Sequence, residues 1–206
     1  MDSVSGGVIP ALGTGATVSG TPGPNTTTGK FGNAVFLPNT ERNDVNFMRL
    51  GKHIDDCFGN LSLCPDGVTF SFWFKIESPI TPWSHMMIST VYFMPFETLS
   101  DGYRPQVHVR NETHTQSFTF NDLYAYGKWY HMAITYAPGS GAEVYINGCV
   151  PVGRTITTRP YNLVVMNFVL GCDQGVRCIR VHFDEFRFWT AKKSQLFVWQ
   201  LWNMEE

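Results

Sequence analysis

The chain has 206 residues, which fits one large domain, and 43% of them are hydrophobic. Only 16% are charged and 15% are aromatic, a composition that excludes a disordered or acidic tail protein. The net charge is −2 without a basic cluster, and no apolar run reaches the roughly 20 residues of a membrane span. We therefore expect no nucleic-acid partner and no membrane insertion by this domain. The first ten residues have neither a basic start nor an apolar core, so no signal peptide is expected there.

The first part of the chain, residues 1–28, is rich in Gly, Pro and Thr. Such a composition favours irregular structure. We predict that residues 1–28 form an arm over the domain or a linker, and that residues 29–206 form the folded domain.

The clearest strand is Val68–Ile76, with the sequence VTFSFWFKI. Apolar residues occupy every second position, while Thr69, Ser71, Trp73 and Lys75 alternate with them, which is the period of a strand and not of a helix. This pattern predicts one core face and one polar face. Trp73 falls on the polar face, where an aromatic ring could contact a ligand.

Further strands are predicted in pairs. Gln106–Arg110 and Gln116–Phe120 form one predicted pair, and Trp129–Tyr136 is joined to Ala142–Asn147 by a PGSG turn typical of a hairpin. Leu163–Leu170 is nearly all apolar, which predicts a strand buried on both faces.

The last strand, Ile179–Trp189, changes its phase, because Phe183 and Phe186 fall on opposite parities. A bulge at Asp184–Glu185 would bring both onto one face. A short C-terminal helix with Thr190 as a possible cap follows. The chain is therefore predicted to be all-β, an antiparallel two-sheet sandwich with a short C-terminal helix.

Five cysteines suggest an oxidising compartment. Cys57 and Cys64 enclose a polar loop and are predicted to form a disulfide. Two of Cys149, Cys172 and Cys178 are expected to pair, which leaves one thiol unpaired or bridging two chains.

Three N-x-S/T sequences are candidate glycosylation sites, at Asn25, Asn60 and Asn111. Asn60 lies inside the loop between Cys57 and Cys64. Together with the cysteines, these sites predict an extracellular protein, either secreted or part of an ectodomain.

Five segments resemble one family in the expected order: Gly29–Leu37, Gly67–Lys75, Lys128–Tyr136, Val144–Gly148 and Phe183–Trp189. They are similar to laminin-G-like and pentraxin-like domains of the concanavalin A-like superfamily. The resemblance implies a jelly-roll sandwich that serves as an extracellular recognition module, usually as one part of a larger surface or matrix protein.

Pentraxin-like members often hold calcium at one rim, and the resemblance places Asp101 and Asp173 as carboxylate ligands and the carbonyl of Gln174 as a third. Gly102 and Gly175 stand where the pattern has side-chain ligands. Calcium takes 6–8 oxygen ligands, so a site short of two would be weak or absent.

The same fold also carries polysaccharide hydrolases, which need two carboxylates about 5–9.5 Å apart. Asp184 and Glu185 are adjacent in sequence, so in a regular strand they would point to opposite faces. The other carboxylates show no alternating arrangement on one strand face, and we expect no enzyme activity.

The sequence thus predicts a module that binds a glycan or an extracellular protein through its rim loops, with calcium as a candidate cofactor. Tyr103 and Tyr161 are the loop aromatics selected as ligand contacts. The alternatives are a homotypic assembly or structural module without glycan binding, in which case oligomers are expected, and a polysaccharide hydrolase.

Overall fold

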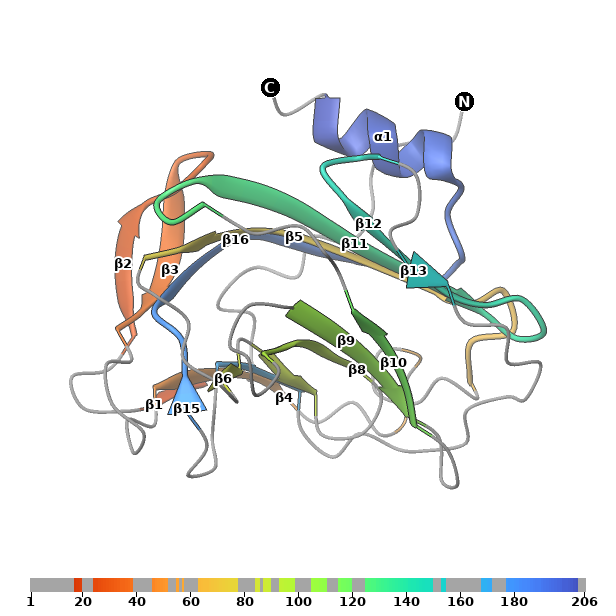
Figure 1. Ribbon diagram of the computed structural model, residues 1–206, viewed down its shortest axis with the longest axis horizontal. Coiled ribbons are helices and arrows are strands. Elements are labelled where there is room, and N and C mark those ends of the chain that lie inside the picture. Colours follow the sequence, from red (N-terminus) through yellow and green to blue (C-terminus); the bar gives the residue numbers. More distant parts are fainter. Residues whose placement is uncertain are drawn as a thin grey trace.

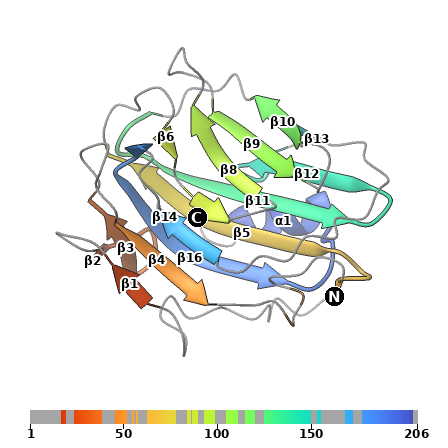
Figure 2. The ribbon, with the colours of Figure 1, turned by 90° about the horizontal axis from the view of Figure 1, so that it is seen from below.

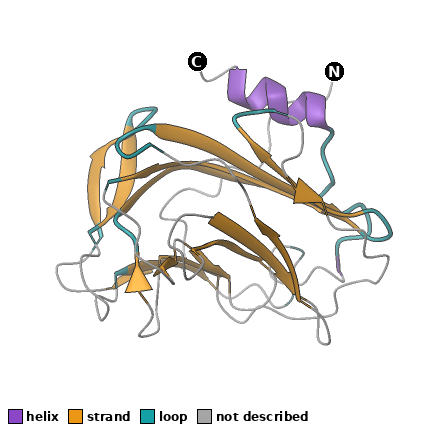
Figure 3. Ribbon diagram, viewed as in Figure 1, coloured by secondary structure: helices purple, strands orange, loops and turns teal. Residues whose placement is uncertain are grey.

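Two layers of β-sheet lie face to face, and a helix covers the outer face of the larger layer (Figures 1 and 3). The computed structural model describes residues 17–19, 24–38, 46–51, 55, 57, 63–77, 84–85, 87–89, 93–98, 105–110, 115–119, 125–149, 153–154, 168–171 and 177–203. Within these ranges the arrangement confirms the predicted all-β sandwich with a C-terminal helix.

The described strands of the larger layer form a seven-stranded sheet in the order β13-β12-β11-β5-β16-β3-β2. Their bounds are β2 (Asn25–Thr28), β3 (Asn33–Leu37), β5 (Val68–Ile76), β11 (Trp129–Ala137), β12 (Gly141–Ile146), β13 (Gly153–Arg154) and β16 (Val181–Trp189). Every pairing in this sheet is antiparallel. Residues 25–28, which the sequence assigned to the arm, form the edge strand β2, and its partner is β3.

The opposite layer consists of two sheets that lie side by side (Figure 2). One contains β1 (Thr17–Ser19), β4 (Phe47–Gly51), β7 (Met87–Ser89) and β14 (Phe168–Gly171). The other contains β6 (Ser84–His85), β8 (Phe93–Thr98), β9 (Pro105–Arg110), β10 (Thr115–Thr119) and β15 (Arg177–Cys178). The short β6–β15 pair is parallel, and the other pairs of this layer are antiparallel.

Both predicted hairpins are present. β9 pairs with β10, and β11 pairs with β12 across the Gly- and Pro-containing turn. Of the predicted strand Leu163–Leu170, the described part begins at Phe168.

Strand β5 is the centre of the core. Its inward side chains lie in one apolar cluster with those of neighbouring strands, and the members from β5 are Val68, Phe70, Phe72, Phe74 and Ile76. Phe72 contacts Phe183 and Phe186 with ring centroids 5.9 and 6.0 Å apart. Burying a side chain of this size contributes about 1.5–3 kcal/mol.

The outward face of β5 was predicted to be polar, with Trp73 available to contact a ligand, but most of this face is buried. Thr69, Ser71 and Trp73 are all buried, and Trp73 is only 2% exposed. Trp73 is therefore not an open ligand contact. The side chains are buried because other segments cover this face.

The outer face of the sheet is built in four cross-strand rows, centred on Thr69, Ser71, Trp73 and Lys75 of β5. The flanking residues from β11 and β16 are Thr135 and Trp189 in the first row, Ala133 and Arg187 in the second, His131 and Asp184 in the third, and Trp129 and His182 in the fourth. The segment after β16 is held over the first row, because Thr69 Oγ1 donates to the carbonyl of Ala191 and accepts from the N–H of Lys193, each at 2.9 Å.

Helix α1 (Gln195–Asn203) covers the first two rows. Val198 packs with Ala133 and Tyr145, and Phe197 contacts Trp189 edge to face at 5.4 Å. The prediction that Thr190 caps the helix is wrong. Ser194 caps the helix, since its Oγ accepts from the N–H of Phe197 at 3.3 Å, and β16 continues to Trp189 before the chain turns.

Phe31, in the turn between β2 and β3, covers the third row, where its ring meets Trp73 edge to face at 5.9 Å. Lys30 lies beside it, with Nζ 4.8 Å from the centre of the Trp73 ring. Among the described residues, no helix is long and apolar enough to cross a membrane.

Gly67 precedes β5 with φ +81°, and a Cβ there would collide with the backbone carbonyl of Tyr136 and lie 2.9 Å from Ala137. We expect Gly67→Ala to reduce the free energy of unfolding by about 3 kcal/mol, through a left-handed backbone and a backbone clash. Gly139→Ala is the matched control, because Gly139 has φ +80° and open space around the new Cβ. It should cost about 1 kcal/mol. Equal urea midpoints for the two variants would contradict the clash.

His131 is 1% exposed and contacts Trp73. Burial, helped by the Arg187 charge, lowers the pKa of His131 to about 3. The unfolded chain takes up this proton near pH 6.5 and the native state does not, so stability should fall as pH drops from about 6.5 towards 3. The slope approaches about 1.4 kcal/mol per pH unit for one proton. Urea unfolding of His131→Phe across this range should show a flatter dependence than the unaltered protein.

Candidate functional site

The side chains predicted to bind calcium or ligand at the rim, Asp101, Tyr103, Tyr161, Asp173 and Gln174, lie outside the described residues. The strands that flank two of these segments are described. Thr98 ends β8, and Arg177 begins β15.

These two strand ends lie at the same end of the five-stranded sheet. Strand β6 links them. Its first residue, Ser84, pairs with Arg177 at the start of β15, and its second residue, His85, pairs with Glu97 near the end of β8. Segments 99–104 and 172–176 therefore connect to one end of the sheet. The rim site that the family resemblance implied for these two segments stays a prediction.

The adjacent carboxylates Asp184 and Glu185 lie at a bulge in β16, as the phase change predicted. The pairing of β16 with β5 shifts register between Asp184 and Arg187. Glu185 has φ 49°, a left-handed conformation that costs a non-glycine residue of order 1–3 kcal/mol. The bulge allows Phe183 and Phe186 to face the same core.

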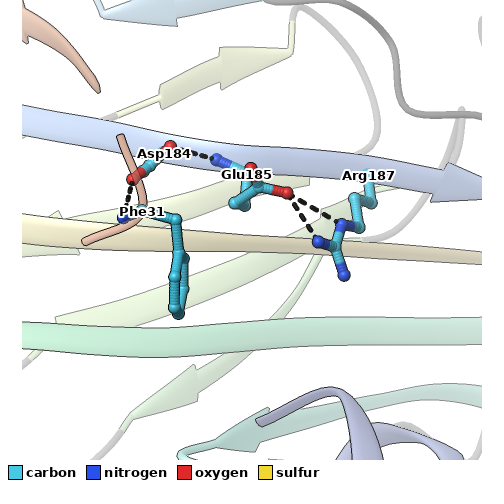
Figure 4. Close-up of polar contacts among 4 residues, drawn as sticks. All are labelled: Phe31, Asp184, Glu185 and Arg187. Atoms are coloured by element: carbon cyan, nitrogen blue, oxygen red, sulfur yellow. Dashed lines mark hydrogen bonds and ion pairs between the residues drawn. The ribbon is translucent and has the colours of Figure 1, made fainter. Parts of the chain in front are cut away.

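The Asp184 carboxylate is engaged by the backbone (Figure 4). Oδ2 accepts from the N–H of Phe31 at 2.9 Å, and Oδ1 accepts from the N–H of Glu185 at 2.8 Å. Burial raises the pKa of Asp184, and these two N–H groups oppose the rise. The carboxylate thus fastens the turn before β3 to the bulge.

Glu185 is paired with Arg187 on the same strand. Its Oε2 accepts from Nη2 at 2.6 Å and from Nε at 3.1 Å. Both side chains are partly exposed. The charge of Glu185 is therefore compensated by Arg187, two residues further along the strand. The bulge in β16 lies between Asp184 and Arg187.

A pocket of about 40 Å³ lies beside the bulge, between the two layers. Its lining residues are Asn33, Val35, Met48, Leu50, Leu170, Phe183, Asp184, Glu185 and Phe186. This volume can hold water molecules, but it is far below the several hundred Å³ of ordinary ligand pockets. The pocket beside the bulge is therefore smaller than an ordinary substrate cleft, and both carboxylates beside it have partners.

No group of three or more His, Cys, Asp or Glu residues in the described ranges is arranged to hold a metal ion. Because Asp101 and Asp173 lie outside these ranges, calcium at the rim stays a prediction.

The cysteines that were predicted to pair across the polar loop, Cys57 and Cys64, are joined by a disulfide. Cys149 is exposed and unpaired. Cys178 belongs to β15, and Cys172 lies outside the described residues.

Among the candidate glycosylation sites, Asn25 begins the edge strand β2 and is exposed. Asn60 and Asn111 lie outside the described ranges.

Residues 53–196, more than half of the chain, match the laminin-G-type family described as the concanavalin A-like lectin/glucanases superfamily. The chain belongs to this family. The resemblance expected from the five sequence segments is thereby confirmed. No curated protein sequence matches the chain.

Solved structures share the concanavalin A-like fold. Domain 4 of AbnA, a GH43 extracellular arabinanase from Geobacillus stearothermophilus in complex with arabinotriose, is similar with a TM-score of 0.67 and 16% identity, over 90% of this chain and 87% of that one. The binding domain of botulinum neurotoxin DC in complex with SialylT is similar with a TM-score of 0.67 and 13% identity, over 93% of this chain.

A structure of botulinum neurotoxin type C, whose cell entry is described as dependent upon interaction with two ganglioside molecules, matches with a TM-score of 0.67 and 14% identity, over 93% of this chain. The chain spans less than half the length of these neurotoxin structures, 46% and 47%. At such identities the likeness shows the fold alone.

Asp184→Asn should lower the free energy of unfolding by about 1–3 kcal/mol, because one oxygen becomes an NH2 group that faces a backbone N–H. Since burial raises the native pKa above the ordinary value of about 3.9, the native state of the unaltered protein keeps the proton to higher pH. The contribution of Asp184 to stability therefore falls as the pH rises from its ordinary pKa to its pKa in the native state.

Urea unfolding from pH 3 to 7 should show this component in the unaltered protein and not in Asp184→Asn. Asp66→Asn, at an exposed aspartate, controls for the loss of one negative charge. If the stability difference between the unaltered protein and Asp184→Asn instead grew with rising pH, the raised pKa of Asp184 would be contradicted.

Proposed function

We propose that this chain is a non-catalytic extracellular recognition module that binds a glycan through segments 99–104 and 172–176 at one rim. The observation that carries the proposal is its likeness to domain 4 of the arabinanase, which spans most of both chains and was solved with arabinotriose. A recognition function also agrees with the neurotoxin binding domain in complex with SialylT.

The rim proposal is supported by the common sheet end to which both segments connect. Asp101, Asp173 and the carbonyl of Gln174 would supply oxygen ligands to calcium, and Tyr103 would offer its ring to a sugar. Tyr161 lies outside both segments and is a second candidate ring. The metal is proposed as an accessory, because Gly102 and Gly175 supply no side-chain ligand.

A non-catalytic role is supported by the surroundings of Asp184 and Glu185. A glycosidase needs one carboxyl free to donate a proton and another free to attack or to activate water. Asp184 accepts two backbone N–H groups, and Glu185 is paired with Arg187. These contacts support the proposed non-catalytic role.

An extracellular location is supported by the Cys57–Cys64 disulfide, because such bonds persist in oxidising compartments. The exposed Asn25 in its N-T-T sequence is compatible with that location.

Protein recognition or self-assembly is the second candidate, and one feature favours it. The uncharged helix α1 exposes Leu196 and Trp199, which are 62% and 48% accessible. Exposed large apolar side chains close together are common at protein interfaces.

The test is a glycan array on protein secreted from eukaryotic cells, run in calcium and in chelator. We expect binding to a limited set of oligosaccharides, with affinity reduced about tenfold in Tyr103→Ala, which corresponds to about 1.4 kcal/mol. Loss in chelator and in Asp173→Asn would assign calcium to the rim, whereas retention in chelator would keep the glycan and discard the metal.

Two results would reject the proposal. Absence of binding in both buffers, with concentration-dependent self-association, would favour the assembly module. Hydrolysis of a bound polysaccharide that disappears in a folded Glu185→Gln variant would make the protein an enzyme.

A further inference from the structure

The fourth row of the outer face differs from the other three. It runs Phe36, His182, Lys75 and Trp129 across β3, β16, β5 and β11. Helix α1 contacts the first two rows and Phe31 the third. In the fourth row, the side chains of Phe36, Lys75 and Trp129 remain partly exposed.

The aromatic rings of this row hold two cations. Lys75 Nζ lies 5.4 Å from the centre of the Trp129 ring, and the Arg180 guanidinium lies 5.5 Å from that of Phe36. His182 lies between these two aromatic rings. It is stacked on Phe36 at 4.4 Å and meets Trp129 edge to face at 6.0 Å. A cation over a ring is stabilised by about 0.5–1 kcal/mol at an exposed site.

The charge of this surface is positive. Glu77 is its acidic member, and Oε1 of Glu77 binds Lys75 Nζ at 2.9 Å and His182 Nε2 at 2.8 Å. Burial lowers the pKa of His182, so the cationic groups are Lys75, which also contacts Glu77, and Arg180. Lys128, beside Trp129, is exposed and adds to it.

Arg180 has no ion-pair partner among the described residues, and its Nε is buried without a hydrogen bond. The two cations lie over different rings. Lys75 is over Trp129 and Arg180 is over Phe36, the rings at the two ends of the row. An acidic group beside each ring would therefore contact one cation.

We propose that the fourth row, with Arg180 and Glu77, is a second binding site, for a glycan chain that carries acidic groups at intervals. Lys75 and Arg180 each pair with an acidic group of the glycan. The exposed edges of Trp129 and Phe36 contact the sugar rings between, and Glu77 accepts from a sugar hydroxyl. The site lies on the outer face of the seven-stranded sheet and is separate from the rim of the opposite layer.

A sugar chain is favoured over an acidic peptide because the site combines flat aromatic edges with spaced cations and has no apolar cavity among its described residues for a side-chain anchor. Carboxylated and sulfated sugars share the chemistry that this site recognises. The experiment separates them.

The measurement is titration calorimetry with four probes: a sulfated oligosaccharide, a carboxylated oligosaccharide of equal length, their uncharged counterpart and poly-glutamate. We expect one or both acidic oligosaccharides to bind, and the double variant Lys75→Gln, Arg180→Gln to weaken that binding at least tenfold. Lys193→Gln is the matched control. Its Nζ also lies over a ring, 5.1 Å from the Phe197 centroid, but at the α1 end of the sheet. It should change the affinity less than twofold.

Equal weakening in Lys193→Gln would reduce the effect to general electrostatics and overturn the site. Equal binding of the uncharged oligosaccharide or of poly-glutamate would overturn the proposal that the ligand is an acidic glycan.

If the double variant does not fold, Arg180→Lys replaces it. That variant keeps the charge but loses the planar fork, and it should weaken the acidic oligosaccharide severalfold. Unchanged affinity in Arg180→Lys would also reject the site. Array binding at the rim should persist in these variants, so the two proposals fail independently.

Discussion

Burial of strand β5 on both faces is the constraint on which the rest of the sandwich depends. Its inward rings form the apolar core with β11 and β16, and Phe72 alone contacts three other phenylalanine rings. Its outward face carries Trp73, which could not remain in water without exposing a large apolar surface. Two segments distant in sequence, Phe31 and helix α1, therefore close over the sheet.

The bulge in β16 follows from the same constraint. A regular strand would turn either Phe183 or Phe186 away from the core, at a cost of about 1.5–3 kcal/mol. The bulge keeps both inside and places Glu185 in a left-handed conformation. Asp184 and Arg187 then stabilise the irregular backbone and its acidic side chain. Both carboxylates thus take part in holding the bulge.

The sequence predicted correctly those elements whose structure depends on neighbouring residues in the chain. The period of two in β5, the turn after β11 and the changed phase in β16 each specified an element correctly, because a strand's alternation and a turn's geometry depend on adjacent residues. The burial of Trp73 depends on Phe31, 42 positions away, which no alternation reveals. Both Thr190 and Ser194 are suitable caps, and only the packing of Trp189 on Phe197 decides between them. The fourth row was missed for the same reason, since its members come from four strands.

The two proposed surfaces would differ in what binding costs. The proposed rim ligands belong to segments that connect strands. The fourth row belongs to the central sheet, where Lys75 and Arg180 already lie over rings. Cations held in this way lose little conformational freedom on binding, so their contribution to affinity is larger than that of free surface lysines.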